Sequence, residues 1–157
     1  MKLKSIILGI ITWTILMIII PNYLIKLNIN FGYPVYDSLF LDFLGIIFIL
    51  IGIGLFIYST FLFKIFGKGT PAPIEPPKKL VINGLYKITR NPIYIGYILI
   101  LFGELLYFGP ILLLIYLISI IILINIYLIF YEEPILEKRF GKRYKTYINN
   151  VPRWFFK

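Results

Sequence analysis

Two groups of polar side chains each border a long hydrophobic segment. The first comprises Tyr86, Arg90, Asn91 and Tyr94, and the second is the adjacent acid pair Glu132-Glu133. The chain contains no cysteine and no histidine, which excludes thiol nucleophiles, the commonest transition-metal ligands and the usual general base near neutral pH. Any chemistry must therefore use Tyr, Glu, Asp, Arg, Lys, backbone groups and what a cofactor supplies, and we expect no metal site.

The acid pair allows two interpretations. Adjacent residues on a helix point about 100° apart, so Glu132 and Glu133 cannot both face one ligand in the same way. We expect at least one of them to point into a helix bundle, where its carboxylate could bind a cationic group. Alternatively, both are solvated carboxylates at the membrane boundary, or first-turn acids of a helix that begins at Pro134.

The other polar residues also have structural explanations. Arg90 and Tyr94 share a face if a helix already begins there, but single tyrosines are ordinary anchors at a membrane interface. The combination of Tyr86 and Tyr94 with Arg90 and Asn91 favours a site. Glu104 is an acid inside an apolar segment, which makes it a functional candidate by default. Its place five residues before Gly109 favours a local hydrogen-bonding role instead.

Composition places these residues in a membrane protein. Of the 157 residues, 60% are hydrophobic and 18% aromatic, and the mean hydropathy is +0.90, which is too apolar for a soluble domain of this length. The formal charge of +9 comes from basic residues at the ends of hydrophobic segments, as in cytoplasmic flanks. Nucleic acid is therefore not an expected partner. We expect one membrane domain over residues 1–157.

Four hydrophobic segments predict an all-α, polytopic membrane helix bundle. The first runs from Ile6 to Ile20 and weakly on through Leu27, and Pro21-Asn22-Tyr23 predicts the end of that span. A loop over Asn28–Asp37 leads to the second span, Ser38–Phe63. Residues 1–66 thus hold two N-terminal spans.

Glycines in the second span, Gly45, Gly52 and Gly54, favour close packing against another helix. The alternative is that Gly52-Ile53-Gly54 lets a cofactor approach the backbone. The connection that follows, Gly67–Asn91, is rich in proline and favours an extended, stiff path. The return of Leu80, Val81, Leu85 and Tyr86 within it argues for an ordered segment docked on the membrane face.

The run from Ile93 to Phe130 is too long for a single span. Gly109-Pro110 divides it into a tight helical hairpin with arms Pro92–Phe108 and Pro110–Tyr131. The open ends of such a hairpin carry the two polar groups, so we expect Arg90 and Glu132 to lie on the same side of the membrane.

An amphipathic helix is expected after Pro134. Apolar or aromatic residues recur there at helical spacing, and basic residues fill the other positions. This pattern predicts an interfacial helix, broken near Gly141, whose basic face meets water or anionic headgroups. The aromatic residues of Val151–Phe156 suit the headgroup layer. Four spans place all 16 Lys and Arg residues except Lys26 on one side, so we expect both termini and the site to be cytoplasmic.

Four sequence elements, in order and at these spacings, resemble the isoprenylcysteine carboxyl methyltransferase and phospholipid methyltransferase superfamily. They are Gly-x-Gly-Thr-Pro at Gly67–Pro71; Pro76-Pro77-Lys78-Lys79-Leu80-Val81-x-x-Gly84-x-Tyr86; Arg90-Asn91-Pro92-x-Tyr94-x-Gly96; and Glu132-Glu133 followed by Phe140-Gly141-x-x-Tyr144-x-x-Tyr147-x-x-x-Val151-Pro152-Arg153. The resemblance implies an integral membrane methyltransferase that uses S-adenosylmethionine and acts on a lipophilic acceptor. Residues 67–157 would then form the cofactor-binding core.

The resemblance also implies site residues. Lys78, Lys79, Leu80 and Val81 would line the cofactor, with Tyr86 beside them, and the turn Asn91-Pro92-Ile93-Tyr94 would cover it. Glu132 would contact the ammonium group of the cofactor's amino acid. Arg90 and Glu133, the other charged members of the two groups, are the candidates for a catalytic role. Methyl transfer suits a chain without histidine, because a methyl sulfonium needs only a nucleophile held in line and a pocket that excludes water.

Two positions depart from the family pattern. The family often has histidine where this chain has Asn91, which keeps a hydrogen-bonding side chain. Eukaryotic prenylcysteine enzymes carry an arginine at the position of Leu128, where it is thought to hold the substrate carboxylate. This second departure argues against a prenylcysteine carboxylate as the substrate.

Two other functions remain open. NADPH-dependent membrane reductases look similar around Arg90–Tyr94 and Val151–Arg153, although an acid pair is a poor neighbour for a pyrophosphate. A non-catalytic assembly or lipid-binding protein could also keep this fold. The sequence leaves open the acceptor atom and the oligomeric state.

Overall fold

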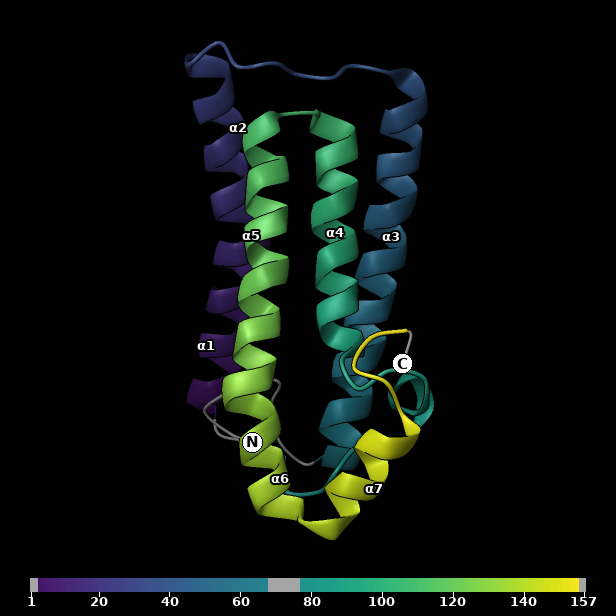
Figure 1. Ribbon diagram of the computed structural model, residues 1–157. Coiled ribbons are helices and arrows are strands. Elements are labelled where there is room, and N and C mark those ends of the chain that lie inside the picture. The colour runs from purple at the N-terminus through teal and green to yellow at the C-terminus, as the bar shows by residue number, and fades with distance from the viewer. Residues whose placement is uncertain (1–2, 68–76, 156–157) are drawn as a thin grey trace.

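The computed structural model describes residues 3–67 and 77–155, which form an all-α bundle (Figure 1). In chain order its elements are α1 (Leu3–Thr14), the π-helical turn η1 (Ile15–Ile19), α2 (Ile20–Asn30), α3 (Leu39–Leu62), the π-helical turn η2 (Phe63–Gly67), the 3₁₀ turn η3 (Gly84–Lys87), α4 (Pro92–Phe108), α5 (Ile111–Tyr127), the π-helical turn η4 (Leu128–Glu132), α6 (Glu133–Phe140) and α7 (Lys142–Asn150). The expected all-α class is confirmed. Most of the Gly-x-Gly-Thr-Pro element, as well as Pro76 and Phe156, lies outside the described residues.

Three continuous helices in the described part of the chain are long and apolar enough to cross a membrane, namely Ile7–Asn30, Leu39–Gly67 and Ile111–Phe140. The fourth expected span, α4, is apolar but has only 17 residues. At 1.5 Å per residue it is about 25 Å long, slightly less than the roughly 30 Å of a bilayer core. Figure 1 shows that α4 begins well short of the ends of α3 and α6.

The first helix does not end at Pro21, so this detail of the sequence prediction is wrong. The chain stays helical to Asn30 because it widens into a π-helical turn just before the proline. In this turn the N–H of Ile20 bonds to the carbonyl of Ile15, five residues back. Such a turn is a common way for a helix to accommodate a local disruption.

The widened turn leaves one carbonyl without a backbone donor, because its partner in this register would be the missing N–H of Pro21. That carbonyl belongs to Leu16. The hydroxyl of Tyr116 donates to it at 3.0 Å and the hydroxyl of Tyr97 at 3.3 Å. A polar group in apolar surroundings is thereby satisfied, and the first helix is tied to α4 and α5.

Glycines hold α3 against α4 at very short range. A Cβ atom built on Gly45 would lie 2.7 Å from the carbonyl oxygen of Gly103, and one on Gly52 would lie 2.8 Å from that of Gly96. The prediction that glycines of the second span serve packing is confirmed for Gly45 and Gly52. It is wrong for Gly54, which is exposed and has nothing within 4 Å of a built Cβ.

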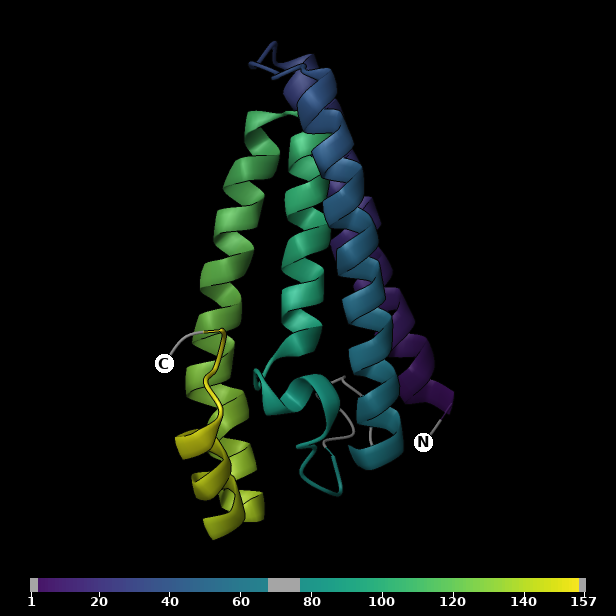
Figure 2. The same cartoon turned by 90° about the vertical axis from the view of Figure 1, so that its right-hand side faces the viewer.

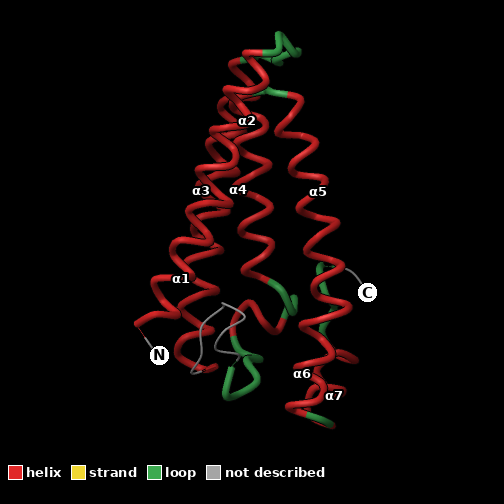
Figure 3. The backbone as a smooth tube through the Cα atoms, turned by 90° about the vertical axis from the view of Figure 1, so that its left-hand side faces the viewer, coloured by secondary structure: helices red, strands yellow, loops and turns green. Residues whose placement is uncertain are grey.

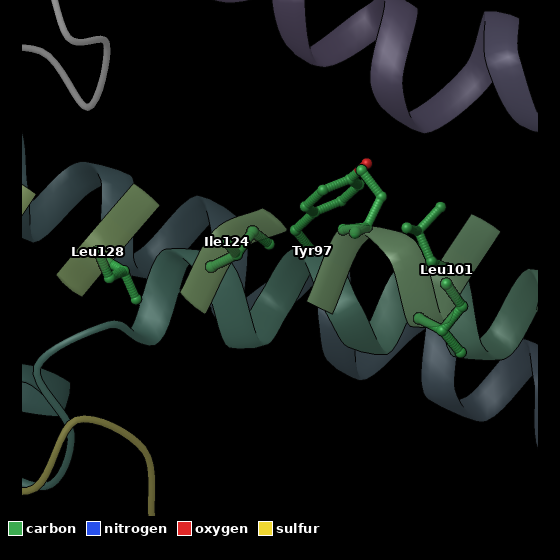
Figure 4. Packing of buried hydrophobic residues seen from close by; sticks show 6 residues of the cluster. Tyr97, Leu101, Ile124 and Leu128 are labelled. Carbon is green, nitrogen blue, oxygen red and sulfur yellow. The ribbon is translucent and has the colours of Figure 1, made fainter. Parts of the chain in front are cut away.

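A hydrophobic core connects the two arms of the α4–α5 hairpin. Its buried members are Tyr97 and Leu101 on one arm, and Leu117, Ile120, Ile124 and Leu128 on the other arm and its π-helical extension. Figure 4 shows Tyr97, Leu101, Ile124 and Leu128 along this contact. At the hairpin turn, Gly109 has φ +66° and its carbonyl accepts the N–H of Tyr36 at 3.0 Å. This contact secures the loop between α2 and α3.

Glu104 lies in α4 with its Oε2 buried and without a hydrogen-bond partner among the described residues. The local hydrogen bond expected for this acid is therefore not seen at Oε2.

The C-terminal helix is broken at Gly141, as predicted, and the chain folds back there. This glycine has φ +52°, a backbone conformation that other residues rarely adopt. Figures 1 and 2 show α6 continuing the path of α5 and α7 returning beside it. Tyr144 and Tyr147 on the apolar face of α7, together with Val151 just after the helix, pack against Leu80 and Ile82 of the long connection.

We predict that Gly103→Val destabilises the bundle far more than Gly54→Val. A built Cβ at Gly103 comes within 2.6 Å of the carbonyl oxygen of Gly45, so the two helices must separate. Overpacking of this kind costs about 1–3 kcal/mol or more, whereas an exposed substitution stays within about 0.5 kcal/mol. Thermal unfolding in detergent, followed by circular dichroism, measures both. Equal losses would contradict the packing role.

Candidate functional site

A pocket lies at the end of the bundle where α6 and α7 meet the long connection. It encloses about 720 Å³ of empty space, a figure that includes the open solvent at its mouth. Figures 2 and 3 show the segment that begins at Pro77 between α3 on one side and α6 and α7 on the other. The pocket is therefore enclosed by segments that are far apart in the sequence.

Most of the site residues expected from the sequence line this pocket. They are Leu80, Val81, Tyr86, Arg90, Asn91, Pro92, Ile93, Tyr94, Glu132 and Glu133. Lys78 and Lys79 do not line it, because their side chains are exposed. Their backbone N–H groups instead donate to the carbonyl of Gly67, at 2.8 and 3.2 Å, and so fix the start of the segment.

Other lining residues were not expected to belong to the site. They are Trp13, Phe63, Pro77, Leu128, Leu136, Tyr144 and Tyr147. Trp13 comes from α1, which looked only like a hydrophobic span. Tyr144 and Tyr147 were expected only to form part of the apolar face of an interfacial helix. Leu128 had been considered only as a departure from a family pattern.

Glu132 reaches the pocket from the end of the π-helical turn η4. Its Oε2 accepts a hydrogen bond from the hydroxyl of Tyr94 at 3.0 Å. This bond joins the last long helix to the first turn of α4, and it occupies one carboxylate oxygen. Among the described residues, no bond to Oε1 is seen, so this oxygen is available to a ligand.

Glu133 lies between two arginines and uses both of its oxygens. Its Oε1 accepts from Nη1 of Arg90 at 2.9 Å and from Nε of Arg153 at 2.8 Å, and its Oε2 accepts from Nη2 of Arg153 at 2.9 Å. The bidentate contact with Glu133 raises the pKa of Arg153. With both oxygens engaged, Glu133 is suited to hold Arg90 in place.

The segment after α7 is bound to the loop that carries Arg90. The N–H of Arg90 donates to the carbonyl of Pro152 at 3.0 Å. The carbonyl of Arg153 accepts from the side chains of Thr89 at 2.9 Å and Asn91 at 3.1 Å. Asn91, predicted to cover a cofactor, thus uses its side-chain amide to hold the C-terminal segment.

Trp154 fastens the same segment to α5. Its indole Nε1 donates to Oδ1 of Asn125 at 3.1 Å. No role was predicted for Asn125 from the sequence, although a polar side chain within an apolar helix indicates a specific contact.

Three tyrosines form an uncharged wall. The hydroxyl of Tyr147 donates to the backbone carbonyl of Tyr86 at 2.7 Å. Burial, with the negative charge of Glu133 as the next cause, raises the pKa of Tyr144 to about 12. Burial also raises the pKa of Tyr86 and of Tyr147. All three side chains therefore stay neutral at physiological pH and present aromatic and hydroxyl groups to the pocket.

The pocket can accommodate a small molecule with a positive charge. A free carboxylate oxygen of Glu132 attracts a cation, and the aromatic rings of Trp13, Tyr86 and Tyr94 offer faces over which a cation is stabilised. Arg90 lines the same pocket, so its guanidinium can attract an anionic group there. Together these groups fit a ligand that carries both signs of charge.

The fold and the pocket define a class: an integral membrane helix bundle with a pocket at one end. A family model described as phospholipid methyltransferase matches residues 40–143, which is more than half of the 157-residue chain. The chain belongs to this family and is, by family, a membrane methyltransferase. Comparisons with curated proteins and with solved structures found no match.

We predict that Arg153→Gln lowers the stability of the protein, because Glu133 then loses its bidentate partner. A hydrogen bond to a charged group contributes about 1.5–3 kcal/mol. Arg143→Gln is the control, because Arg143 is exposed on α7 and the change removes the same charge. Thermal unfolding in detergent compares the two variants. If both unfold at the same temperature as the unaltered protein, the role of the Glu133 contact is wrong.

Proposed function

We propose that this protein transfers a methyl group from S-adenosylmethionine to a lipophilic acceptor that reaches the pocket from the bilayer. The observation that carries the proposal is the free oxygen of Glu132, in a pocket lined by the residues that match the methyltransferase pattern. Residues 67–157 would supply most of the cofactor site. Residues 1–66 would contribute its hydrophobic side through Trp13 and Phe63.

The residues of the pocket fit this cofactor. Its amino-acid part carries an ammonium, for which Glu132 Oε1 is unpartnered among the described residues. It also carries a carboxylate, which the guanidinium of Arg90 would attract. Its sulfonium and its adenine suit the aromatic rings of Trp13, Tyr86 and Tyr94. S-adenosylmethionine would supply an electrophilic methyl group, so the protein need not provide a metal or a histidine.

The protein's own contribution is position and exclusion of water. Tyr94 holds the Glu132 carboxylate, and Glu133 holds the guanidinium of Arg90. Such fixed groups orient a bound molecule and so supply much of the rate of a bimolecular transfer. Of the two catalytic candidates, Arg90 is therefore proposed to contact ligand, whereas Glu133 is proposed to position Arg90.

A lipophilic acceptor agrees with the apolar side of the pocket. Leu128 and Leu136 line it from η4 and α6, and Trp13 lines it from α1. Leu128 stands where a substrate-binding arginine would be expected in a prenylcysteine enzyme. We therefore propose an acceptor whose apolar part lies along these residues.

We predict that Glu132→Gln weakens binding of S-adenosylhomocysteine, which keeps the ammonium but lacks the transferred methyl. Loss of a partly buried charge partner costs about 2 kcal/mol or more, roughly thirtyfold in Kd. Isothermal titration of the detergent-solubilised protein measures the Kd. Glu137→Gln is the matched control, because Glu137 is exposed on α6, pairs with Lys145 of α7 and does not line the pocket.

Folded protein that binds no S-adenosylhomocysteine would overturn the proposal. Protection against thermal unfolding by NADPH, but not by S-adenosylmethionine, would favour a reductase. Binding without transfer of labelled methyl into any lipid of the membrane extract would favour a non-catalytic lipid-binding role.

We further propose that the pocket end and both termini face the cytoplasm. The chain has no native cysteine, so single cysteines can report the topology. Lys87→Cys lies in η3 at the pocket end, and Lys26→Cys lies in α2 toward the other end. A membrane-impermeant maleimide added to intact cells should label only the cysteine at position 26. Labelling of position 87 alone would reverse the orientation.

A further inference from the structure

The surface of α6 and α7 that faces away from the pocket is strongly basic. Its cationic side chains are all exposed, and they are Lys138 and Arg139 on α6 and Lys142, Arg143 and Lys145 on α7. Two acids belong to these helices. Glu137 pairs with Lys145 at 3.2 Å, and Glu133 is turned inward to Arg90 and Arg153. The surface therefore keeps a large positive excess.

A shallow hollow separates the two helices on this surface. It is lined by Lys138, Lys142 and Lys145, together with Pro134, Glu137 and Gly141. Since Lys145 is paired with Glu137, the hollow keeps a net charge of two ammonium groups, which would attract an anionic group of a neighbouring molecule.

The length of the last helix places this surface at the level of lipid headgroups. The continuous helix Ile111–Phe140 has 30 residues, which corresponds to about 45 Å, whereas the hydrocarbon core is roughly 30 Å thick. Its outer portion therefore passes through the headgroup layer. The basic surface is thus beside phosphate groups of the membrane in which the protein already lies.

The opposite face of α7 is a wall of the pocket. Tyr144 and Tyr147 line the pocket from this helix, and Tyr147 donates to the carbonyl of Tyr86 at 2.7 Å. The end of α7 leads directly into the segment that holds Arg90 and Glu133. Whatever restrains the outer face of α7 therefore also restrains the inner face and the charged groups behind it.

We propose that anionic phospholipid headgroups bind the basic surface of α6 and α7 and thereby stabilise the pocket wall that α7 forms. The lipid-binding half of this proposal, that headgroups bind the surface, is argued from the charge and position of the surface alone. The coupling half, that this binding stabilises the pocket wall, rests on the proposed cofactor site. A bilayer is favoured over a soluble acidic partner because the surface continues a membrane span and meets the headgroups without any further association.

The first experiment measures lipid binding without the cofactor. The variant Lys138→Gln, Lys142→Gln, Arg143→Gln removes three charges, leaves the Glu137–Lys145 pair intact and keeps good helix formers. The control Lys4→Gln, Lys64→Gln, Lys87→Gln removes three exposed charges from α1, η2 and η3. Native mass spectrometry compares retention of phosphatidylglycerol with that of phosphatidylcholine.

Unaltered protein and control should both prefer phosphatidylglycerol. Each cation near an anionic surface contributes about fivefold to the association, so the α6–α7 variant should lose most of that preference. Equal preference in variant and control would overturn the lipid-binding half. So would equal retention of the two lipids by the unaltered protein.

The second experiment measures the Kd for S-adenosylhomocysteine in nanodiscs of phosphatidylcholine with and without phosphatidylglycerol. The anionic lipid should tighten binding severalfold in the unaltered protein and the control, but not in the α6–α7 variant. Binding that ignores the lipid would overturn the coupling. No binding in any nanodisc would overturn the coupling together with the proposed function, and the lipid retention would still decide the first half.

Discussion

A carboxylate held by two guanidinium groups connects the segments that enclose the pocket. Glu133 stands at the start of α6, Arg90 precedes α4, and Arg153 follows α7. Without this contact the loop before α4 would carry a partly buried cation, and the C-terminal segment would lose its ion pair and depend on its backbone, hydroxyl, amide and indole contacts. A charge removed from water is stable only when it is paired, so the three segments assume their positions together.

Glu132 and Glu133 are neighbours in the sequence, but their side chains point in different directions. Because neighbouring helical residues diverge by about 100°, Glu133 turns to the arginines while Glu132 turns to Tyr94 and the pocket. One acid serves structure and the other remains available to a ligand. Their positions at the end of η4 and the start of α6 place both acids beside Arg90 and the first turn of α4.

The hydrocarbon of the bilayer surrounds the bundle, and this explains two of its other contacts. A carbonyl freed by the π-helical turn before Pro21 accepts two tyrosine hydroxyls, because lipid offers no donor in place of water. In lipid the hydrophobic effect contributes little to the association of helices, and the glycines between α3 and α4 let the two backbones come into contact. Both devices keep α1, α3 and α4 close enough for Trp13 and Phe63 to reach the pocket.

The sequence by itself determined the helical spans, the hairpin at Gly109-Pro110, the break at Gly141 and most of the pocket lining, because hydropathy, turn chemistry and a family pattern are local. The prediction that the first helix ends at Pro21 and the prediction that Gly54 serves packing were wrong, and no role was predicted for Asn125 or Trp13. Only the tertiary structure assigned Glu133 to two arginines, turned Tyr144 and Tyr147 inward and left Lys78 and Lys79 outside. The direction of a side chain depends on which neighbour offers a partner, and those neighbours are distant in the sequence.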